Sequence, residues 1–538
     1  MPSYFSLLFK QDFSDVKAAG TSWEKLSRKM HDAFDMHRTK VTGPLHANWE
    51  GDDAENALRF LEDIETRVQI VQTEAMAITK VIDTTRQRME QAQKDLRAVV
   101  NDAEAQHFRI DDDGNVRLPK QWEEPQPDES DETRYERLNK EALLQDYQVA
   151  INRAVDDALR ASGEGQKALA ELDGEILDHK NKQMAAESAR DVDKVMDRLG
   201  EKGPKIPDDP KGAAEWWKGL DADEQREYAT LYPDRIGTTD GLPSDVRDDA
   251  NRMRMEQELN ALRRTDAYAV PGNDERRHNL ETLKAELDKR DGAPENKQLY
   301  LLNHDAGGDG KAVIAMGNPD TADNVAVQVP GTSTTMDSTG GQLNRIGKLQ
   351  DAAEHEDPGT TTSTVYWLGY DAPEAPLLEE ANTEVAATQR AEDGAQPLRD
   401  FTHGLRASHE GERANLTVLG HSYGSTTVGA AASDGEGLDA DNIVAVGSPG
   451  MTVDRADQLN TENVYFGQAS DDGIGWAQGL SLGRGPTHPD WGGTRFETDT
   501  SGHSGYWDDN SRSLANQGRI IAGKPVEEYV PPSQRDNR

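Results

Sequence analysis

The sequence contains no cysteine among its 538 residues. Disulfide bonds, thiolate metal ligands and a cysteine nucleophile are therefore excluded. Apolar runs are short, and none approaches the roughly 18 consecutive residues of a membrane-spanning helix. Residues 1–10 carry an apolar patch without a basic leader or a small-residue cleavage site, so we expect no secretory signal peptide. We therefore expect a cytoplasmic protein, or one exported without such a peptide.

Basic residues are scarce relative to acidic ones. The chain has 60 lysines and arginines against 100 aspartates and glutamates, a formal net charge of −40. A surface of this sign repels nucleic acid and anionic membranes, so we predict neither as a partner. We interpret the excess of acid as a solvated surface.

Motifs for metals and cofactors are also missing. The chain has no HExxH, no histidine–cysteine cluster and no complete EF-hand loop. The Asp-rich stretch Ile110–Asn115 lacks the closing glutamate of a calcium loop and is better read as a hairpin turn. The glycine-rich turn Gly307–Gly310 is too short to hold a phosphate. We predict no metal site and no cofactor.

The N-terminal part has a helical pattern. Residues 13–105 predict a helical hairpin, with a break at Thr42-Gly43-Pro44 followed by Trp49-Glu50-Gly51. In the second helix, apolar residues recur every three or four positions, apart from one last step of seven, which predicts packing along a partner helix. These residues are Ala54, Leu58, Leu61, Ile64, Val68, Val71, Ala75, Ile78, Ile82 and Met89.

This hairpin resembles the WXG-type helical hairpins associated with type VII secretion, in which Trp-x-Gly lies at the turn between antiparallel helices. The resemblance covers about the first hundred residues and implies a helical protein partner and export by that route. A generic coiled-coil hairpin is the alternative.

The next stretch is mixed in pattern. Residues 108–118 predict a β-hairpin, residues 123–132 a mobile linker, and residues 134–198 a helical region broken at Gly163 and Gly165. Trp216 and Trp217 begin a compact helical connector, where we favour core packing over ligand binding. We divide the chain into residues 1–110 (helical hairpin), 111–205 (hairpin, linker and helices), 206–292 (connector), 293–525 (catalytic domain) and 526–538 (disordered tail).

From about residue 298 the pattern changes to alternating strands and helices. Such alternation predicts an α/β fold, a mostly parallel sheet covered by helices on both faces. The predicted strands are 298–303, 312–316, 324–329, 364–368, 416–419, 442–446 and 464–468. The predicted helices are 341–354, 382–408 and 426–432, and the segment 503–521 closes with another.

The clearest chemical motif is Gly420-His421-Ser422-Tyr423-Gly424. A β-favouring run precedes it and a small-residue helical run follows, which is the pattern of a nucleophile elbow. In such a turn the backbone passes close to its neighbours, so Gly420 and Gly424 are needed where a Cβ would clash. The motif predicts Ser422 as a nucleophile.

A serine nucleophile needs a base, and the base needs an acid to orient it. After an elbow of this kind the acid and then the histidine follow in chain order. Of the 13 histidines only His488 and His503 follow Ser422, and we favour His503 because it lies in a loop just before the final helix. The acid should follow the strand 464–468, where we favour Asp472 over its neighbour Asp471.

The oxyanion of a tetrahedral intermediate needs backbone N–H donors. One should be the amide of Tyr423, the residue after the nucleophile. The other should come from the loop after the strand 324–329, where Thr332 is our first choice and Ser333 the second.

Residues from about 216 to 521 resemble an actinobacterial α/β-hydrolase family known only as a domain of unknown function. The stretches that carry the resemblance are Trp216-Trp217, Ile236-Gly237, Asp240–Pro243, Asp320–Val327, Val329–Thr332, Trp367–Pro373, Gly420–Ser425, Val446–Gly450 and Gly502–Tyr506. The resemblance implies an α/β-hydrolase fold and a triad of Ser422, Asp472 and His503. Gly473 departs from the proline expected after the acid, which leaves Asp471 open as the alternative.

These observations predict a serine hydrolase that cleaves a carboxylic ester of a small molecule or lipid through an acyl-enzyme. The alternative is a type VII secretion-linked interaction protein or effector, in which the hydrolase domain is inactive or accessory.

Overall fold

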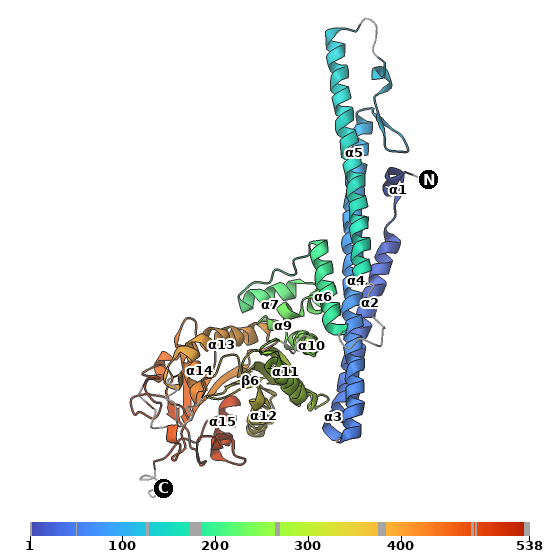
Figure 1. The fold of residues 1–538 in the computed structure, drawn as a ribbon. Coiled ribbons are helices and arrows are strands. Elements are labelled where there is room, and N and C mark those ends of the chain that lie inside the picture. The colour runs from blue at the N-terminus through green and yellow to red at the C-terminus, as the bar shows by residue number, and fades with distance from the viewer. Residues whose placement is uncertain are drawn as a thin grey trace. The chain divides into compact units, whose positions relative to one another are not determined.

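The computed structural model of the chain describes residues 3–49, 51–124, 129–172, 184–263, 270–374, 384–474, 478 and 481–531. It divides into two compact units (Figure 1). The helical unit comprises Met1–Ala33 and Arg67–Lys202, and the α/β unit comprises Phe34–Thr66 and Gly203–Arg538. The central part of the predicted linker, residues 125–128, and about half of the predicted tail, residues 532–538, lie outside the described residues.

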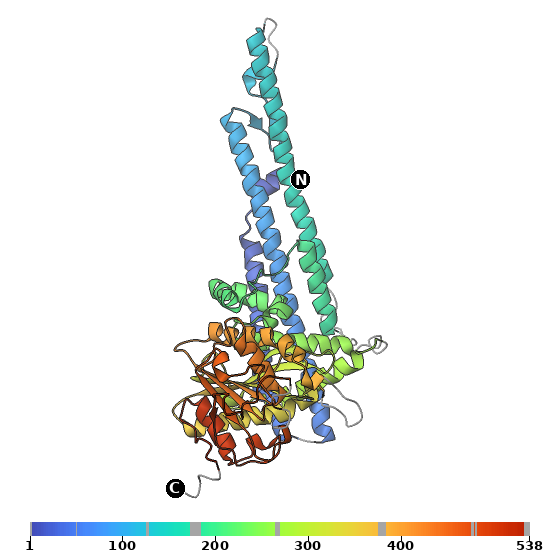
Figure 2. The same ribbon diagram turned by 90° about the vertical axis from the view of Figure 1, so that its left-hand side faces the viewer.

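The helical unit is built on two long helices that run side by side (Figures 1 and 2). Its core joins Leu96 and Val100 of one to Ile151 and Ala154 of the other, and Leu8 closes the cluster. Alternating small and branched side chains let the two helices approach closely along this seam. Its elements are α1 (Tyr4–Lys10), α2 (Ser14–His37), α4 (Asp52–Ala105), α5 (Asp131–Leu172) and α6 (Met184–Leu199), with α2 and α4 continuing into the α/β unit.

The expected break at Thr42-Gly43-Pro44 is wrong. The chain stays helical through a π-helical turn, Arg38–Thr42, and α3, Gly43–Asn48. Pro44 lies in the first turn of α3, where its missing N–H costs no hydrogen bond. Gly43 is required for a different reason, because a Cβ there would lie 2.2 Å from the carbonyl oxygen of Asp291. The turn comes at Gly51, whose φ is +102°.

The expected break at Gly163 and Gly165 is also wrong, because both lie inside α5. A Cβ at Gly165 would lie 2.3 Å from Oγ1 of Thr85 in α4, so this glycine permits the close approach of the two helices. The predicted β-hairpin is confirmed as an antiparallel pair of β1 (Arg109–Ile110) and β2 (Val116–Arg117).

The α/β unit contains an eight-stranded sheet in the order β10-β9-β8-β7-β5-β6-β4-β3. Its strands are β3 (Leu299–Asp305), β4 (Lys311–Met316), β5 (Asn324–Val329), β6 (Thr362–Leu368), β7 (Asn415–His421), β8 (Asn442–Val446), β9 (Asn463–Gly467) and β10 (Thr494–Arg495). The six neighbouring strands β10, β9, β8, β7, β5 and β6 run parallel to one another. Strand β4 pairs antiparallel with β6, and β3 pairs antiparallel with β4. The predicted mostly parallel sheet is confirmed, and the short edge strand β10 was not foreseen.

Helices cover both faces of this sheet (Figures 1 and 2). Successive residues of a strand point to opposite faces. Accordingly, Val418 of β7 belongs to one apolar cluster and Leu419 to a second. The first cluster includes residues of α13 (Gln389–Ser408) and α14 (Tyr423–Ser433), and the second includes residues of α15 (Arg512–Ile521). Residues of α12 (Thr339–Glu356) contribute to both. The turn at Ser422, between β7 and α14, thus lies between two packed layers.

Before the sheet the chain forms a helical connector. Trp217 is buried in a small apolar cluster, and Trp216 packs on it at a ring separation of 5.9 Å. This placement agrees with the core role expected of the tryptophan pair. The connector comprises α7 (Pro210–Gly219), α8 (Ala222–Leu231), α9 (Pro233–Thr238), α10 (Ser244–Leu262) and α11 (Asn273–Asp288).

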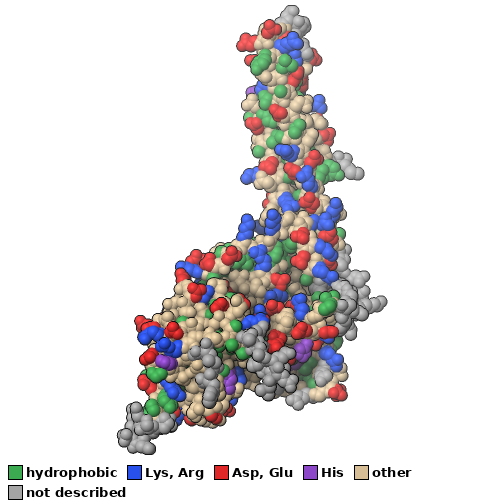
Figure 3. Space-filling view, turned by 60° about the vertical axis from the view of Figure 1, so that its left-hand side comes forward, with side chains coloured by type: hydrophobic (Ala, Val, Ile, Leu, Met, Phe, Trp, Pro, Cys, Tyr) green, Lys and Arg blue, Asp and Glu red, His purple; other side chains and the backbone are tan. Residues whose placement is uncertain are grey.

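Charged side chains of both signs are interspersed over the face of the helical unit drawn in Figure 3, rather than gathered into one basic or acidic patch. Among the described residues, no helix is both long and apolar enough to cross a membrane.

Candidate active site

Ser422 lies at a sharp turn between the buried strand β7 and helix α14. Its φ of 52° and ψ of −131° lie far from the regions that a side chain favours, and its N–H donates to Val446 O at 3.0 Å. A Cβ at Gly420 would lie 2.4 Å from Ser425 Cα, and one at Gly424 would lie 2.3 Å from Val329 O. Only glycine fits at either position, so the spacing of the motif is a requirement of the strained turn.

His503 lies next to this serine. Its Nε2 is 2.8 Å from Ser422 Oγ, and its Nδ1 is 2.9 and 3.0 Å from the two carboxylate oxygens of Asp472. The loop that carries His503 precedes α15, and the loop that carries Asp472 follows β9. Three segments far apart in the chain thus meet in one line of hydrogen bonds. With Nδ1–H donated to the carboxylate, Nε2 is free to accept the serine proton.

The neighbouring candidates occupy other places. Asp471 Oδ1 accepts a hydrogen bond from Gly502 N–H at 2.9 Å, so it holds the backbone of the loop that carries His503. The His488 side chain is 47% exposed, and its closest charged neighbour is Asp490 at 3.9 Å. The geometry therefore pairs Asp472, rather than Asp471, with His503.

Asp472 is enclosed, with a side chain that is 0% exposed. Burial alone would raise the pKa of this carboxyl. Hydrogen bonds from His503, from the Tyr506 hydroxyl at 2.6 Å and from Ile474 N–H at 3.0 Å outweigh burial and lower its pKa below the ordinary value. Asp472 is therefore held as a carboxylate, the state that can orient and stabilise a protonated His503.

Tyr506 is a residue whose role the sequence did not suggest. Its hydroxyl donates to Asp472 Oδ2 and accepts a hydrogen bond from Ala469 N–H at 3.1 Å. Burial and the neighbouring carboxylate raise the pKa of Tyr506, so it stays protonated and remains a donor. The sequence signal that could have pointed to it is its place in the stretch Gly502–Tyr506, three residues after His503.

His421 was also missed, although it lies inside the elbow motif. Its Nε2 is 2.8 Å from the backbone oxygen of His503, so this nitrogen carries the proton and donates it. Burial, reinforced by the adjacent His503, lowers the pKa of His421 to about 3. His421 is therefore neutral at physiological pH and fixes the backbone of the loop that carries His503.

The loop after β5 faces Ser422. A Cβ at Gly331 would lie 2.7 Å from Ser422 Cβ, so only glycine lets the loop backbone pass this close to Ser422. Ser333 N–H donates to Pro373 O at 3.0 Å and is already engaged. Among the described residues none accepts a hydrogen bond from Thr332 N–H. Tyr423 is the first residue of α14, so its N–H belongs to the turn that lacks intrahelical acceptors.

A polar groove of about 400 Å³ opens over Ser422 and His503. Its lining includes hydroxyl, amide, imidazole and charged side chains, and among the described residues it includes no aliphatic one. The lining residues are Gly331, Thr332, Ser333, Thr334, Asp337, Ser338, Gly341, Gln342, Arg345, His421, Ser422, His503 and Ser504.

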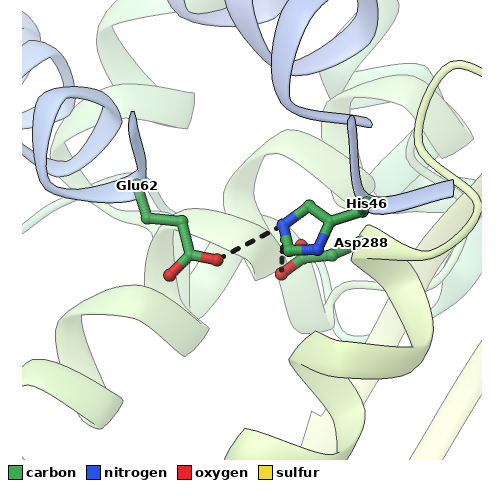
Figure 4. Close-up of side chains that lie close together, drawn as sticks. All are labelled: His46, Glu62 and Asp288. Carbon is green, nitrogen blue, oxygen red and sulfur yellow. Dashed lines mark ion pairs between the residues drawn. The ribbon is translucent and has the colours of Figure 1, made fainter. Parts of the chain in front are cut away.

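A second group of titratable side chains lies within the α/β unit, away from this groove (Figure 4). His46 Nε2 is 3.3 Å from Glu62 Oε1 and 3.8 Å from Asp288 Oδ2, a set that could ligate a metal ion. However, the Lys284 ammonium lies 3.0 Å from Asp288 Oδ2 and 2.9 Å from Glu256 Oε1. A cation is thus already present, and we interpret the group as an ion-pair network that joins α3 and α4 to α11.

Comparison with known proteins agrees with this architecture. The model of a family described as alpha/beta hydrolase matches residues 305–481. The chain has an α/β-hydrolase fold. The matched residues include the β5 loop, the Ser422 elbow and Asp472, and they end before His503.

Several uncharacterised mycobacterial proteins are similar in sequence. One from Mycobacterium tuberculosis is 32% identical over 379 residues, which cover 59% of this chain and 57% of the relative. One from Mycobacterium bovis is 32% identical over 158 residues, 28% of this chain and 56% of the relative. The chain thus aligns with little more than half the length of these relatives.

Among solved structures, an esterase of Rhizomucor miehei shares 15% identity, covering 36% of this chain and 56% of its own. The TM-score of 0.19 is too low to bear on fold or function.

Proposed function

We propose that the chain is a serine hydrolase that cleaves a carboxylic ester through an acyl-enzyme. The observation that carries the proposal is the unbroken line of hydrogen bonds from Asp472 through His503 to Ser422, set at a strained elbow in an open groove. Asp472, His503 and Ser422 take the roles of acid, base and nucleophile.

The chemistry follows from these positions. Ser422 Oγ attacks the ester carbonyl carbon while its proton passes to His503 Nε2. The N–H groups of Thr332 and Tyr423 stabilise the resulting oxyanion. The C–O bond of the ester breaks, and His503 returns the proton to the departing alcohol. Water, deprotonated by His503, then attacks the acyl-enzyme and releases the acid and Ser422.

The substrate that fits best is a polar small molecule. The groove lining is hydroxylated and charged, which disfavours a long acyl chain, because burying polar groups against hydrocarbon leaves them without partners. We place a lipid ester second for this reason.

Active-site labelling tests the proposal directly. A fluorophosphonate probe should label the full-length protein at Ser422, and Ser422→Ala should abolish labelling and hydrolysis of p-nitrophenyl butyrate. Ser433→Ala, at the far end of α14, is the matched control and should retain both. A folded wild-type protein that neither reacts with the probe nor hydrolyses the ester would refute the proposal.

A secretion-linked role remains the second candidate. The observation that favours it is Trp49, 42% exposed beside the turn between α3 and α4, where an aromatic is available to a partner. Trp49→Ala should then abolish export from an actinobacterial host with a type VII system while leaving ester hydrolysis unchanged. Equal export of the wild type and of Trp49→Ala would exclude a role for this tryptophan in export.

A further inference from the structure

Arg345 projects from α12 into the groove that contains Ser422 and His503. Its guanidinium carbon lies 4.6 Å from the centroid of the Trp507 ring, a cation–π contact. Trp507 is itself fixed, because its ring packs on His421 at 5.0 Å and its backbone oxygen accepts a hydrogen bond from Lys348 Nζ at 3.1 Å. The positive charge is therefore held in one place beside the reacting groups.

This arginine lacks an acidic partner among the described residues. Among the described residues, its hydrogen-bond acceptor is Gln342 Oε1, at a long 3.4 Å. The carboxylate that lines the same groove, Asp337, lies 2.8 Å from Nε2 of His278 instead. Burial lowers the pKa of Arg345, and no carboxylate offsets this.

That Arg345 has no carboxylate partner among the described residues contrasts with the composition of the chain, which has 100 acidic and 60 basic residues. Several buried or half-buried arginines of the α/β unit have carboxylate partners, such as Arg406 with Asp441 at 2.7 Å and Arg252 with Asp248 at 2.7 Å. Others donate to backbone oxygens instead, as Arg254 does to His304 O at 2.6 Å and Arg495 to Gln468 O at 3.2 Å, whereas no such bond is formed by Arg345 among the described residues. A half-buried cation without a counter-charge costs free energy unless something else supplies that charge. In an open groove beside a nucleophile, the available source is the substrate.

We propose that Arg345 is a specificity-determining residue that binds an anionic group, a carboxylate or a phosphate, carried by the ester substrate. The inference rests on the proposed ester hydrolysis and narrows its substrate class to anionic polar esters. The planar guanidinium offers paired N–H donors that match either anion, and a cation–π contact with Trp507 uses its charge rather than these donors.

Two comparisons of substrates, the acyl arm and the alcohol arm, test which part of the ester carries the anion. In the acyl arm, p-nitrophenyl butyrate is compared with the p-nitrophenyl half-ester of glutarate, which adds a carboxylate to the acyl group. In the alcohol arm, p-nitrophenyl butyrate is compared with 3-carboxy-4-nitrophenyl butyrate, which adds it to the leaving group. The measurement is the ratio of kcat/KM for the charged ester to that for the neutral one, and competition by inorganic phosphate reports whether phosphate can occupy the same place.

The enzymes are the wild type, Arg345→Gln, Arg345→Lys and Arg413→Gln. Arg413 is the matched control, because it lies just before β7, at the end of the strand opposite Ser422. We expect Arg345→Gln to lower the charged-to-neutral ratio by about 10- to 100-fold in at least one arm, the range for losing a charged hydrogen bond. Arg345→Lys should recover part of this loss, and Arg413→Gln should leave the ratio unchanged.

If Arg345 serves only to position Trp507, both members of each substrate pair will lose activity equally. Unchanged ratios in both arms, in a variant that a fluorophosphonate still labels at Ser422, would overturn this inference and leave the proposed hydrolase intact. Loss of labelling in the wild type would instead overturn the proposed function.

Discussion

At Gly163, in α5 of the helical unit, no atom lies within 4 Å of the place that a Cβ would take. At Gly424, in α14 of the α/β unit, a Cβ would lie 2.3 Å from Val329 O and 2.4 Å from Pro330 O. The surroundings of Gly163 leave room for a larger residue, whereas at Gly424 only glycine fits. The two positions therefore differ in how closely their surroundings specify the residue, and Gly165, two residues along α5, resembles Gly424 in this respect.

Buried polar residues show the same difference. In α4 of the helical unit the buried face carries Gln69 and Gln72 among its apolar residues. Such a face can pack in several ways, since long polar side chains can reach solvent or one another. Around Ser422, by contrast, the Tyr506 hydroxyl bonds both Asp472 and Ala469 N–H, and His421 donates to the backbone oxygen of His503. We expect substitutions to be costly near the elbow and mild along the long helices.

The largest expected effect is at the acid. Asp472→Asn should lower kcat for ester hydrolysis by about 10⁴-fold, because an amide cannot hold the imidazole in the required tautomer or stabilise its charge. Asp471→Asn should lower it by less than about tenfold, since that carboxylate only accepts from Gly502 N–H. Steady-state kinetics of both variants make the comparison. A reversed order would assign the acid role to Asp471.

The next effect separates the two units directly. Gly424→Ala should destabilise the α/β unit by about 3 kcal/mol, because the backbones of β5 and α14 must move apart. Gly163→Ala should instead stabilise the helical unit by up to about 1 kcal/mol through helix propensity. Differential scanning calorimetry measures both changes. Similar losses of stability in Gly424→Ala and Gly163→Ala would contradict the expected difference between the two positions.

A smaller effect concerns pH. The pKa of His421 falls to about 3 on folding, so below its ordinary value of 6.5 the unfolded chain takes up the proton first. Stability contributed by neutral His421 is therefore complete above pH 6.5 and is lost as the pH falls toward 3. At about 1.4 kcal/mol per pH unit, the loss between pH 7.5 and 5 is about 2 kcal/mol.

His421→Gln removes the titration and retains a donor for the His503 backbone oxygen. Urea unfolding at pH 7.5, 6 and 5 should show a loss of stability about 2 kcal/mol smaller in this variant than in the wild type. His488→Gln is the matched substitution of an exposed histidine. Identical pH dependence in wild type and His421→Gln would show that His421 is not held neutral.

Local patterns identified much of the α/β unit in advance. The buried apolar runs located seven strands, because a strand covered on both faces needs such a run. The glycine spacing located the Ser422 turn, and chain order reduced thirteen histidines to two. The same approach failed at Gly165 and Pro44, where a residue that often ends a helix is instead required inside one by a neighbour or by its place in the first turn.

The sequence by itself determined that a strained serine turn exists and where its base and acid could come from, because those features depend on spacing and order along the chain. Only the tertiary structure placed Asp472, rather than Asp471, against His503, paired the amide of Ser333 with Pro373, held His421 neutral and left Arg345 without a carboxylate partner among the described residues. Each of these depends on distances between segments that are far apart in sequence. Hydrogen bonds and ion pairs form over a few ångströms of space, and only the packed fold sets which groups come within that reach.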